Sequence, residues 1–556
     1  MKRLGMPAKG LQPVNLKGLG SQGLNTQTES STLGPQWLVE ADNVVFDFQG
    51  KISARKGRKQ TSQTVALPIK SIGEFIKTDR TTEYYASSGA YIYKLDRDIT
   101  PTSLTAVSFG GSPQTISESD WQWHNFNNEF WGVQSGHKVI NYDGSAWKDM
   151  EDLAAYVGSP GVTLFDPSCA LGEFGRMWYG GVTEDKGTLY YSDNLIGEKL
   201  NSGAAGVIDL RTVWGNDEIV GLASIMDKII IFGKSSIVIY KGASVPGTMT
   251  LDEVINGVGL ISRDNIANIN ADVVFMSYNG LQSLSRLVAT DGKAPLRDLS
   301  LPVRNDLTDL IINSANSRTL DDIKSTYFQK DAILVTFVPN SSIAYCFDFS
   351  SSGRDGPPRT TTWSFVSAPL CGLGSLDGDF HLGLSNSVGL YDGYYDVSII
   401  DDTSTSGTEG ACNTAGDTWA TSKCWSYTNS DYNYTWKSPW MDLGDPVHAK
   451  IIKSGLFTFT GGKGATSTVS VYKDYETGSF YSKTFTVNTG GIIFLYGNSQ
   501  TLYGAATYAA TGGPEEHKVS LARTGKVIQL KMVTEVTGNY SSLGNTTLLT
   551  KQGKIR

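Results

Sequence analysis

The sequence is poor in charged residues, and it has no long apolar run. Only 18% of its 556 residues are Asp, Glu, Lys or Arg, and the net charge is −8. A negative net charge argues against wholesale binding of nucleic acid through phosphate neutralisation. No run of 18 apolar residues occurs and the first 20 residues have no apolar core, so we expect neither a membrane-spanning helix nor a signal peptide.

Cysteine is scarce as well, and its spacing gives no recognisable pattern. The five cysteines are odd in number, scattered and without a C-x-x-C pair: Cys169, Cys346, Cys371, Cys412 and Cys424. This spacing predicts neither a disulfide framework nor a zinc site. Cys412 and Cys424 are near enough in sequence to pair, but we expect unpaired thiols made in a reducing cytoplasm.

The motifs of the common enzyme classes are missing too. The five histidines lack the spacing of a metal site, and no G-x-S-x-G elbow, phosphate-binding loop, Asp box or D-x-D-x-D-G calcium loop occurs. We therefore predict a protein that is not an enzyme and has no catalytic, cofactor-binding or metal-binding residues. A glycosidase-like pair of carboxylates stays open, because 55 acidic residues offer many pairs and no motif marks one.

What the chain does have is glycine, aromatic residues and a repeated pattern of two apolar strands joined by a polar turn. It holds 61 Gly, 26 Tyr and 21 Phe. The pattern recurs about every 50 residues, and its seven copies begin at Arg80, Asn127, Gly175, Met226, Ala271, Lys330 and Asp377. Repeated hairpins at this period are typical of a β-propeller, since one hairpin cannot bury its apolar face alone. The sequence predicts a mainly β protein with a propeller of six or seven blades over residues 65–400.

The segments around the propeller differ in composition. Residues 1–64 are expected to form an extended N-terminal arm that ends in a basic strand, and residues 401–435 an irregular insertion rich in Ser, Thr and Asn. Apolar residues at helical spacing predict a helix from Pro302 to Asn313, inserted between blades, where it covers a rim or touches a neighbouring subunit. Alternating strands from 436 to 556, including the apolar segment 490–497, predict a C-terminal β-sandwich-like domain.

A basic cluster lies at the end of the N-terminal arm, although the whole chain is acidic. The first 60 residues carry nine Lys and Arg against four Asp and Glu, and Arg55, Lys56, Arg58 and Lys59 account for four of the nine. Two interpretations stay open, which are contact with an acidic partner and a solvated tail. Trp436 and Trp440 likewise either pin the C-terminal domain against the propeller or pack inside it.

The segment from Asp120 to Gly132 is rich in aromatic residues. Its large side chains are Trp121, Trp123, Phe126, Phe130 and Trp131. They suit a sugar-binding platform or the core of a propeller blade, and their positions near expected strands favour the core.

One segment resembles a known family. The run from Leu38 to Lys59, LVEADNVVFDFQGKISARKGRK, is similar to the opening of the tail-tube nozzle proteins (tail tubular protein B-like) of short-tailed bacteriophages. These often begin with A-x-N-V-x-F/Y-D-x-x-G-x-I/L-x-x-R-x-G. The matching residues here are Ala41, Asn43, Val44, Phe46, Asp47, Gly50, Ile52, Arg55 and Gly57. Blade-like segments after Gly175 and the segment after Tyr434 extend the resemblance to about residues 20–535.

The resemblance implies a structural protein of the virion tail, assembled in the host cytoplasm. Six copies would form a ring below the head-to-tail adaptor, around a channel that DNA crosses without specific binding. Tail fibre or spike proteins would attach near the outer edge. An acidic lumen, which repels DNA phosphates, is a hypothesis consistent with the net charge of each copy. The alternative function is a carbohydrate-binding or glycan-cleaving β-propeller.

Overall fold

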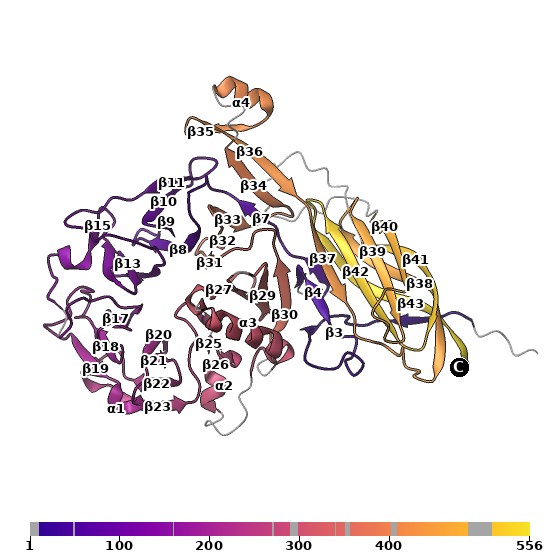
Figure 1. The fold of residues 1–556 in the computed structure, drawn as a ribbon, viewed down its shortest axis with the longest axis horizontal. Coiled ribbons are helices and arrows are strands. Elements are labelled where there is room, and N and C mark those ends of the chain that lie inside the picture. Colours follow the sequence, from indigo (N-terminus) through magenta and orange to yellow (C-terminus); the bar gives the residue numbers. More distant parts are fainter. Residues whose placement is uncertain are drawn as a thin grey trace, which may run out of the picture.

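The protein is a β-propeller joined to a β-sandwich-like domain, as seen in the computed structural model (Figure 1). Seven blades of antiparallel strands surround one axis, and the first strand of each blade packs beside the first strand of the next until the ring closes. The structure describes residues 10–47, 50–158, 161–269, 272–289, 298–317, 319–339, 341–350, 356–401, 408–487 and 514–555. The predicted propeller fold is confirmed.

Blades 1 to 4 each have four antiparallel strands. Blade 1 holds β8 (Ile69–Ile76), β9 (Thr82–Ser88), β10 (Tyr91–Asp96) and β11 (Ser103–Ala106). Blade 2 holds β12 (Gln122–Phe126), β13 (Glu129–Gln134), β14 (His137–Tyr142) and β15 (Trp147–Asp149). Blade 3 holds β16 (Cys169–Glu173), β17 (Arg176–Gly180), β18 (Thr188–Tyr191) and β19 (Gly206–Asp209). Blade 4 holds β20 (Ile219–Ile225), β21 (Lys228–Gly233), β22 (Ser236–Lys241) and β23 (Thr250–Asn256).

Blades 5 to 7 depart from this pattern. Blade 5 has three strands, β24 (Ile266–Ile269), β25 (Asp272–Ser277) and β26 (Gly280–Ser283), followed by helix α2 (Leu284–Ala289). Blade 6 holds β27 (Lys324–Phe328), β28 (Ile333–Phe337), β29 (Ile343–Asp348) and β30 (Arg359–Ser364). Blade 7 holds β31 (Cys371–Gly374), β32 (Phe380–Gly383) and β33 (Val388–Tyr391), and its outer strand is β7 (Arg58–Gln60) from the N-terminal segment. A strand from the other end of the propeller sequence thus closes the ring.

The blade strands read as unbroken apolar runs because each blade is covered on both faces. In β21, Ile229 and Ile231 pack in the core shared with blade 3, while Ile230 and Phe232 pack in the core shared with blade 5. Successive side chains of a strand point to opposite faces, so one strand serves two interfaces. The seven hairpins of the sequence are the second and third strands of the seven blades.

The C-terminal domain is a sandwich of two sheets that share strands with the N-terminal segment. One sheet has the order β41-β38-β43-β6-β5, with β1 beside β43, and the other continues blade 6 in the order β30-β4-β37-β42-β39-β40. The C-terminal strands are β37 (Tyr432–Lys437), β38 (His448–Gly461), β39 (Thr466–Lys473), β40 (Tyr481–Thr486), β41 (Glu515–Gly525), β42 (Ile528–Val536) and β43 (Ser541–Ile555). The apolar segment 490–497 lies outside the described residues.

The N-terminal segment contributes strands to the sheets of both domains. Its strands are β1 (Gln12–Asn15), β2 (Gly23–Leu24), β3 (Trp37–Leu38), β4 (Glu40–Asp42), β5 (Val44–Phe46) and β6 (Ile52–Ala54). β4 pairs with β30 of the propeller on one side and with β37 of the sandwich on the other. The sheet of blade 6 therefore runs without a break into the C-terminal domain.

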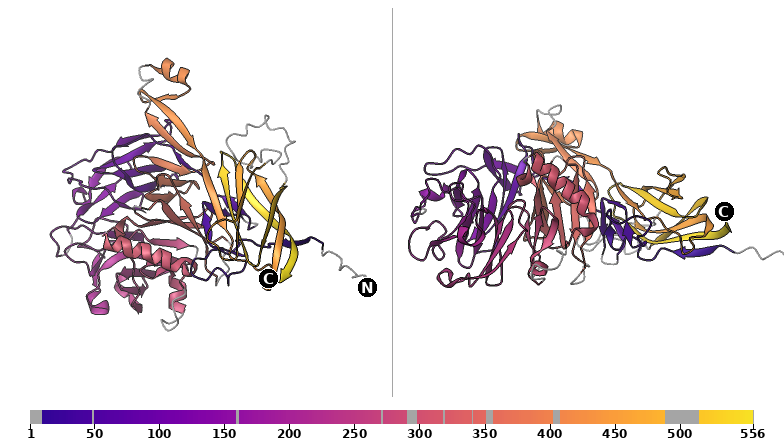
Figure 2. Two further views of the ribbon diagram at one scale, coloured as in Figure 1. Left: turned by 45° about the vertical axis from the view of Figure 1, so that its right-hand side comes forward. Right: turned by 60° about the horizontal axis from the view of Figure 1, so that its bottom comes forward.

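Few helices occur in the described residues. The longest, α3 (Arg304–Asn316), lies where the sequence predicted a helix from Pro302 to Asn313, and it buries Leu307 and Ile311 against the propeller (Figure 2). Single-turn elements are α1 (Arg211–Trp214), η1 (Met150–Asp152), η2 (Pro246–Thr248), η3 (Leu301–Val303) and η4 (Leu320–Asp322). No helix in the described ranges is long and apolar enough to cross a membrane.

An arm projects from the body between the two domains (Figures 1 and 2). Its stem is a hairpin of β34 (Asp396–Asp401) and β36 (Lys423–Ser430), and its tip holds α4 (Glu409–Ala415) and β35 (Thr418–Ala420). The predicted irregular insertion at 401–435 is thus largely regular in its described part.

Gly57 allows the closest backbone approach at the joint between the N-terminal segment and blade 7. A Cβ atom there would lie 1.8 Å from the carbonyl oxygen of Tyr395. We expect Gly57→Ala to lower the free energy of unfolding by about 1–3 kcal/mol, because backbone rather than a flexible side chain must move. Urea unfolding measures this. Gly247→Ala is the control, since a Cβ there meets no atom within 4 Å; equal unfolding midpoints for the two variants would contradict the argument.

Candidate functional site

The propeller axis holds a cavity of ≈ 450 Å³. Its walls come from the first strands of all seven blades, including Glu74, His124, Leu222, Thr326 and Cys371. A DNA duplex, whose major groove alone is about 12 Å wide, is far too large for this space. DNA therefore cannot pass through the propeller axis.

Four charged side chains cross one end of this cavity, where the first strands of the blades begin. Lys324 donates to the carboxylate of Asp120 and to the carbonyl oxygen of Lys70 at 2.8 Å, and it forms an ion pair with Asp264 at 3.3 Å. Arg263 donates to the carbonyl oxygens of Asp120 and Ser168. These contacts join blades 1, 2, 3, 5 and 6 around the axis, so the network helps to hold the ring closed.

The network keeps its charges although it is buried. Burial alone would raise the pKa of Asp120, but the cations of Lys324 and Arg263 more than offset this and the pKa lies below its ordinary value. Burial would lower the pKa of Lys324, but the carboxylates of Asp264 and Asp120 raise it. Two cations thus meet two carboxylates, and each charge is matched within the cluster.

Two further titratable groups in the cavity wall, Cys371 and His124, are held in their neutral forms. Burial raises the pKa of the Cys371 thiol to about 12, which keeps it from acting as a thiolate nucleophile. Burial and the nearby Arg263 cation lower the pKa of His124 to about 4. No group of His, Cys, Asp and Glu in the described residues is arranged to hold a metal ion.

A second buried charge cluster lies at the joint between the two domains and centres on Arg55. All five N–H groups of its guanidinium have acceptors: Asn43 Oδ1 at 2.7 Å, the carbonyl oxygens of Lys56 at 2.7 Å and Ser364 at 3.0 Å, and both oxygens of Asp396 at 3.1 and 3.2 Å. The guanidinium lies between the rings of Phe365 and Tyr432, 4.3 and 4.2 Å from their centroids. Arg55 is 0% exposed.

The partners of Arg55 come from four parts of the chain. Asn43 belongs to the N-terminal segment, Ser364 ends blade 6, Asp396 begins the arm, and Tyr432 begins the strand that leads into the C-terminal domain. Asp396 also accepts a hydrogen bond from the backbone N–H of Arg58 at 2.8 Å. A fully satisfied, stacked guanidinium has one geometry, so it fixes these four segments relative to one another.

The residues that carry the family resemblance gather at this joint. Asn43 has a φ of 56° and holds the Arg55 side chain, and Gly57 passes against Tyr395. Gly50, at a φ of 74°, turns the chain between β5 and β6. The apolar motif positions are all buried: Ala41, Val44, Phe46 and Ile52. The motif thus encodes how the N-terminal segment joins the two domains.

The members of the predicted basic cluster differ in their exposure to solvent. Arg55 and Arg58 are buried and Lys56 is half-buried, so only Lys59 presents its side chain to solvent. Arg55 and Arg58 are therefore not available for the expected contact with an acidic partner. The sequence misled here because Asp396, which neutralises Arg55, lies 341 residues away.

The two predicted tryptophans differ in their surroundings. Trp436 is 0% exposed and packs in a core shared by the C-terminal domain and the propeller, together with Leu307 and Met532. Trp440 is half-buried, and its ring lies 5.1 Å from that of Tyr475. Trp436 therefore helps to join the domains, and Trp440 packs at the edge of the C-terminal domain.

The aromatic segment of blade 2 is core and not a surface platform. Trp121 is 1% exposed, and Phe130 and Trp131 are 0% exposed. Trp123 stacks on Phe130 at 4.9 Å and donates its indole N–H to Ser71. Trp123 is half-buried and borders the axial cavity together with Trp121, so the segment offers no broad platform on the outer surface.

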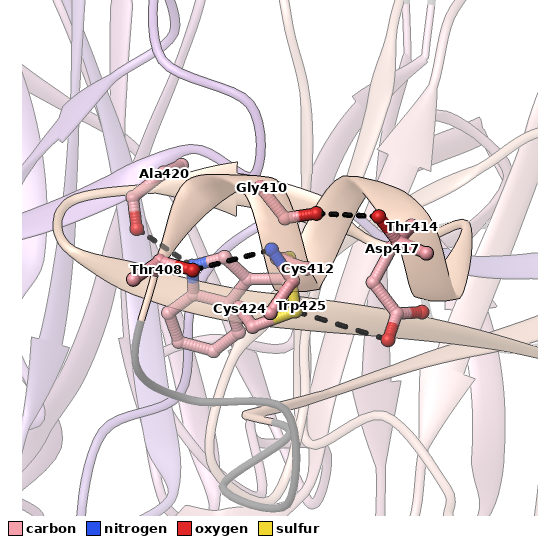
Figure 3. The surroundings of a disulfide bond; sticks show 9 residues. Thr408, Gly410, Cys412, Thr414, Asp417, Ala420, Cys424 and Trp425 are labelled. Atoms are coloured by element: carbon pink, nitrogen blue, oxygen red, sulfur yellow. Dashed lines mark hydrogen bonds between the residues drawn. A yellow bond between two sulfur atoms is a disulfide. The ribbon is translucent and has the colours of Figure 1, made fainter.

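The structure corrects the expectation of unpaired thiols. Cys412 in α4 and Cys424 in β36 form a disulfide that joins the helix to the stem of the arm (Figure 3). Thr408 caps α4 by accepting a hydrogen bond from Ala411 N, and Trp425 donates to the carbonyl oxygen of Ala420. The signal in the sequence was the short separation of 12 residues across the Gly416–Asp417 turn. Cys169, Cys346 and Cys371 are buried and free.

Comparisons with known proteins give no family. No family model and no curated protein matches the chain. Among solved structures, PorZ of the type-IX secretion system of Porphyromonas gingivalis is 10% identical, with a TM-score of 0.36 over 59% of this chain. The Cps50 (Swd1) β-propeller domain of Myceliophteria thermophila is 8% identical, with a TM-score of 0.37 over 60% of this chain and 98% of its own length. The Pan2 WD40 domain of Neurospora crassa is 8% identical, with a TM-score of 0.36 over 60% of this chain and 96% of its own length.

Similarity at this level carries no argument about function. The chain spans only 37% of the length of the PorZ structure and 42% of the extracellular domain of a putative one component system from B. thetaiotaomicron.

Removal of the Arg55 guanidinium should destabilise the joint strongly. We expect Arg55→Met to lower the free energy of unfolding by about 3–5 kcal/mol, because it leaves the Asp396 carboxylate buried without its cation. Urea unfolding measures the loss. Lys59→Met on the neighbouring strand is the matched control and should stay within about 0.5 kcal/mol of wild type, since Lys59 is exposed. A small loss for Arg55→Met would show that the joint does not depend on this ion pair.

The disulfide should stabilise the tip of the arm and little else. After reduction, or in a Cys412→Ser/Cys424→Ser variant, we expect amide hydrogen exchange in residues 409–430 to quicken by about 100-fold, because the cross-link limits local unfolding. Mass spectrometry of the exchanged protein gives the rates. Exchange in the propeller blades should stay unchanged, and faster exchange there instead would contradict a local role.

Proposed function

We propose that this chain is a non-catalytic structural subunit of a short-tailed bacteriophage tail. In this proposal six copies form the nozzle ring below the head-to-tail adaptor and enclose the channel for DNA ejection. Tail fibre or spike proteins attach near the outer edge of the ring. The protein is assembled in the host cytoplasm and resides in the tail of the virion.

The observation that carries the proposal is the joint around Arg55. The same residues that resemble the nozzle family, Asn43, Arg55 and Gly57 among them, tie the propeller, the arm and the C-terminal domain into one body. A subunit in the wall of a channel needs a fixed angle between its domains, and a sheet shared by both domains adds to that rigidity.

The axial cavity supports a route for DNA outside the propeller. At ≈ 450 Å³ it is too small for a duplex, and the network of Asp120, Arg263, Asp264 and Lys324 crosses it. A DNA channel therefore has to be enclosed by several copies of the chain. The alternative, a glycan-directed propeller, has less support, because most of the aromatic rings of blade 2 are packed in the blade core.

Assembly on the adaptor tests the proposal. The purified 60.1 kDa chain, mixed with a cognate portal–adaptor complex, should add six copies per adaptor ring in native mass spectrometry. An adaptor from an unrelated phage is the control and should recruit none. A chain that stays monomeric beside its cognate adaptor, or that binds or cleaves glycans on an array, would refute the nozzle.

A further inference from the structure

The propeller and the C-terminal domain carry net charges of opposite sign. Residues 61–435, which hold the propeller and the arm, carry 25 Lys and Arg against 44 Asp and Glu. Residues 436–556 carry 13 against 7, and the first 60 residues carry 9 against 4. One molecule therefore offers an acidic propeller and a basic C-terminal domain, which are surfaces of complementary charge.

The basic end has a groove lined by lysines. The lysine groove consists of Lys453, Lys518 and Lys551 with Leu11, Gly10, Ser454 and Ser520, and its volume is ≈ 650 Å³. The three lysines stand on adjacent strands in the order β41-β38-β43, and Leu11 directly precedes β1 at the edge of the same sheet. Leu11 is 52% exposed.

No ion pair balances the positive charges of these three lysines in the described part of the chain. Within the described ranges, none of the three forms an ion pair, whereas Lys228 and Lys241 of the propeller share Asp252. Like charges on neighbouring strands repel one another. A cluster of this kind gains stability when an acidic surface covers it.

The acidic domain presents a helix with matching chemistry. The α3 face is defined by Asp306, Asp309 and Ile312, three residues apart, together with Leu301 just before the helix. Ile312 is 50% exposed and Leu301 is 58% exposed, and both carboxylates are exposed and lack ion pairs among the described residues. The opposite side of α3 is buried, so this face is the one left for a partner.

We propose that the α3 face of one copy docks in the lysine groove of the next copy. Asp306 and Asp309 meet the lysines, and Ile312 and Leu301 cover Leu11. The two surfaces are different patches of the same chain, so the contact is heterologous and repeats from copy to copy into a closed ring. This inference rests on the ring of the proposed function and names the surfaces that build it.

A protein occupant fits the groove better than nucleic acid. Single-stranded sites combine basic residues with aromatic rings on which bases stack, and no aromatic residue is among those that line this groove. The complementary charge is moreover present on the chain itself.

Charge reversal tests the contact. Lys453→Glu/Lys518→Glu and Asp306→Lys/Asp309→Lys should each weaken ring assembly at least about 10-fold, because like charges then face each other. The variant with all four changes should recover assembly, since the pairs are restored with opposite signs. Native mass spectrometry and sedimentation velocity of the full chain on its cognate adaptor give the stoichiometry and the affinity.

Lys463→Glu/Lys483→Glu is the matched control, with the same charge change on exposed lysines elsewhere in the domain, and should assemble as wild type. Rings that form normally from the groove variant, or no recovery in the four-change variant, overturn the contact and leave the nozzle intact. A wild-type chain that never forms a ring refutes the nozzle itself. Lysine-dependent anisotropy of a fluorescent duplex, with assembly unchanged in the groove variant, would overturn the contact in favour of phosphate.

Discussion

A buried guanidinium must find an acceptor for each of its five N–H groups, and in this protein that requirement organises the whole molecule. Arg55 meets it by gathering Asn43, Ser364 and Asp396, which lie far apart in the sequence. Two flanking rings exclude water from the pair. Because Asp396 pairs with the Arg55 guanidinium at this depth, the cluster helps the propeller, the arm and the C-terminal domain to hold their mutual positions.

The two buried charge clusters hold different parts of the protein together. The network of Lys324, Asp120, Arg263 and Asp264 links blades across the axis, whereas Arg55 links domains across the joint. Neither offers a free nucleophile or base, since each charge is already matched. Both clusters lie in the interior, and the lysine groove lies on the outer surface.

Local patterns in the sequence were sufficient for much of the fold. Apolar strands with turns between them predicted the seven hairpins, and apolar residues at helical spacing predicted α3 within three residues at each end. Features that depend on distant residues were not predictable. Arg55 and Arg58 looked like surface charges because Asp396 lies more than 300 residues away. The basic strand that became β7 was assigned to the N-terminal arm because its partner β33 lies equally far along the chain. The disulfide was missed although its two cysteines are close in sequence. The chain has five cysteines, an odd number, and their scattered spacing gave no decisive pairing pattern.

The pairing of N-terminal strands with strands made much later affects how the protein folds during its synthesis on the ribosome. β7 leaves the ribosome before any propeller blade but pairs with β33, and β1 pairs with β43, which lies more than 500 residues further along the sequence. At about 5–20 residues per second, synthesis takes roughly 15–70 s to proceed from β7 to its partner. Through that interval β7 waits without its partner, so the ring can close only after β33 has been made, and the sandwich can be completed only after β43.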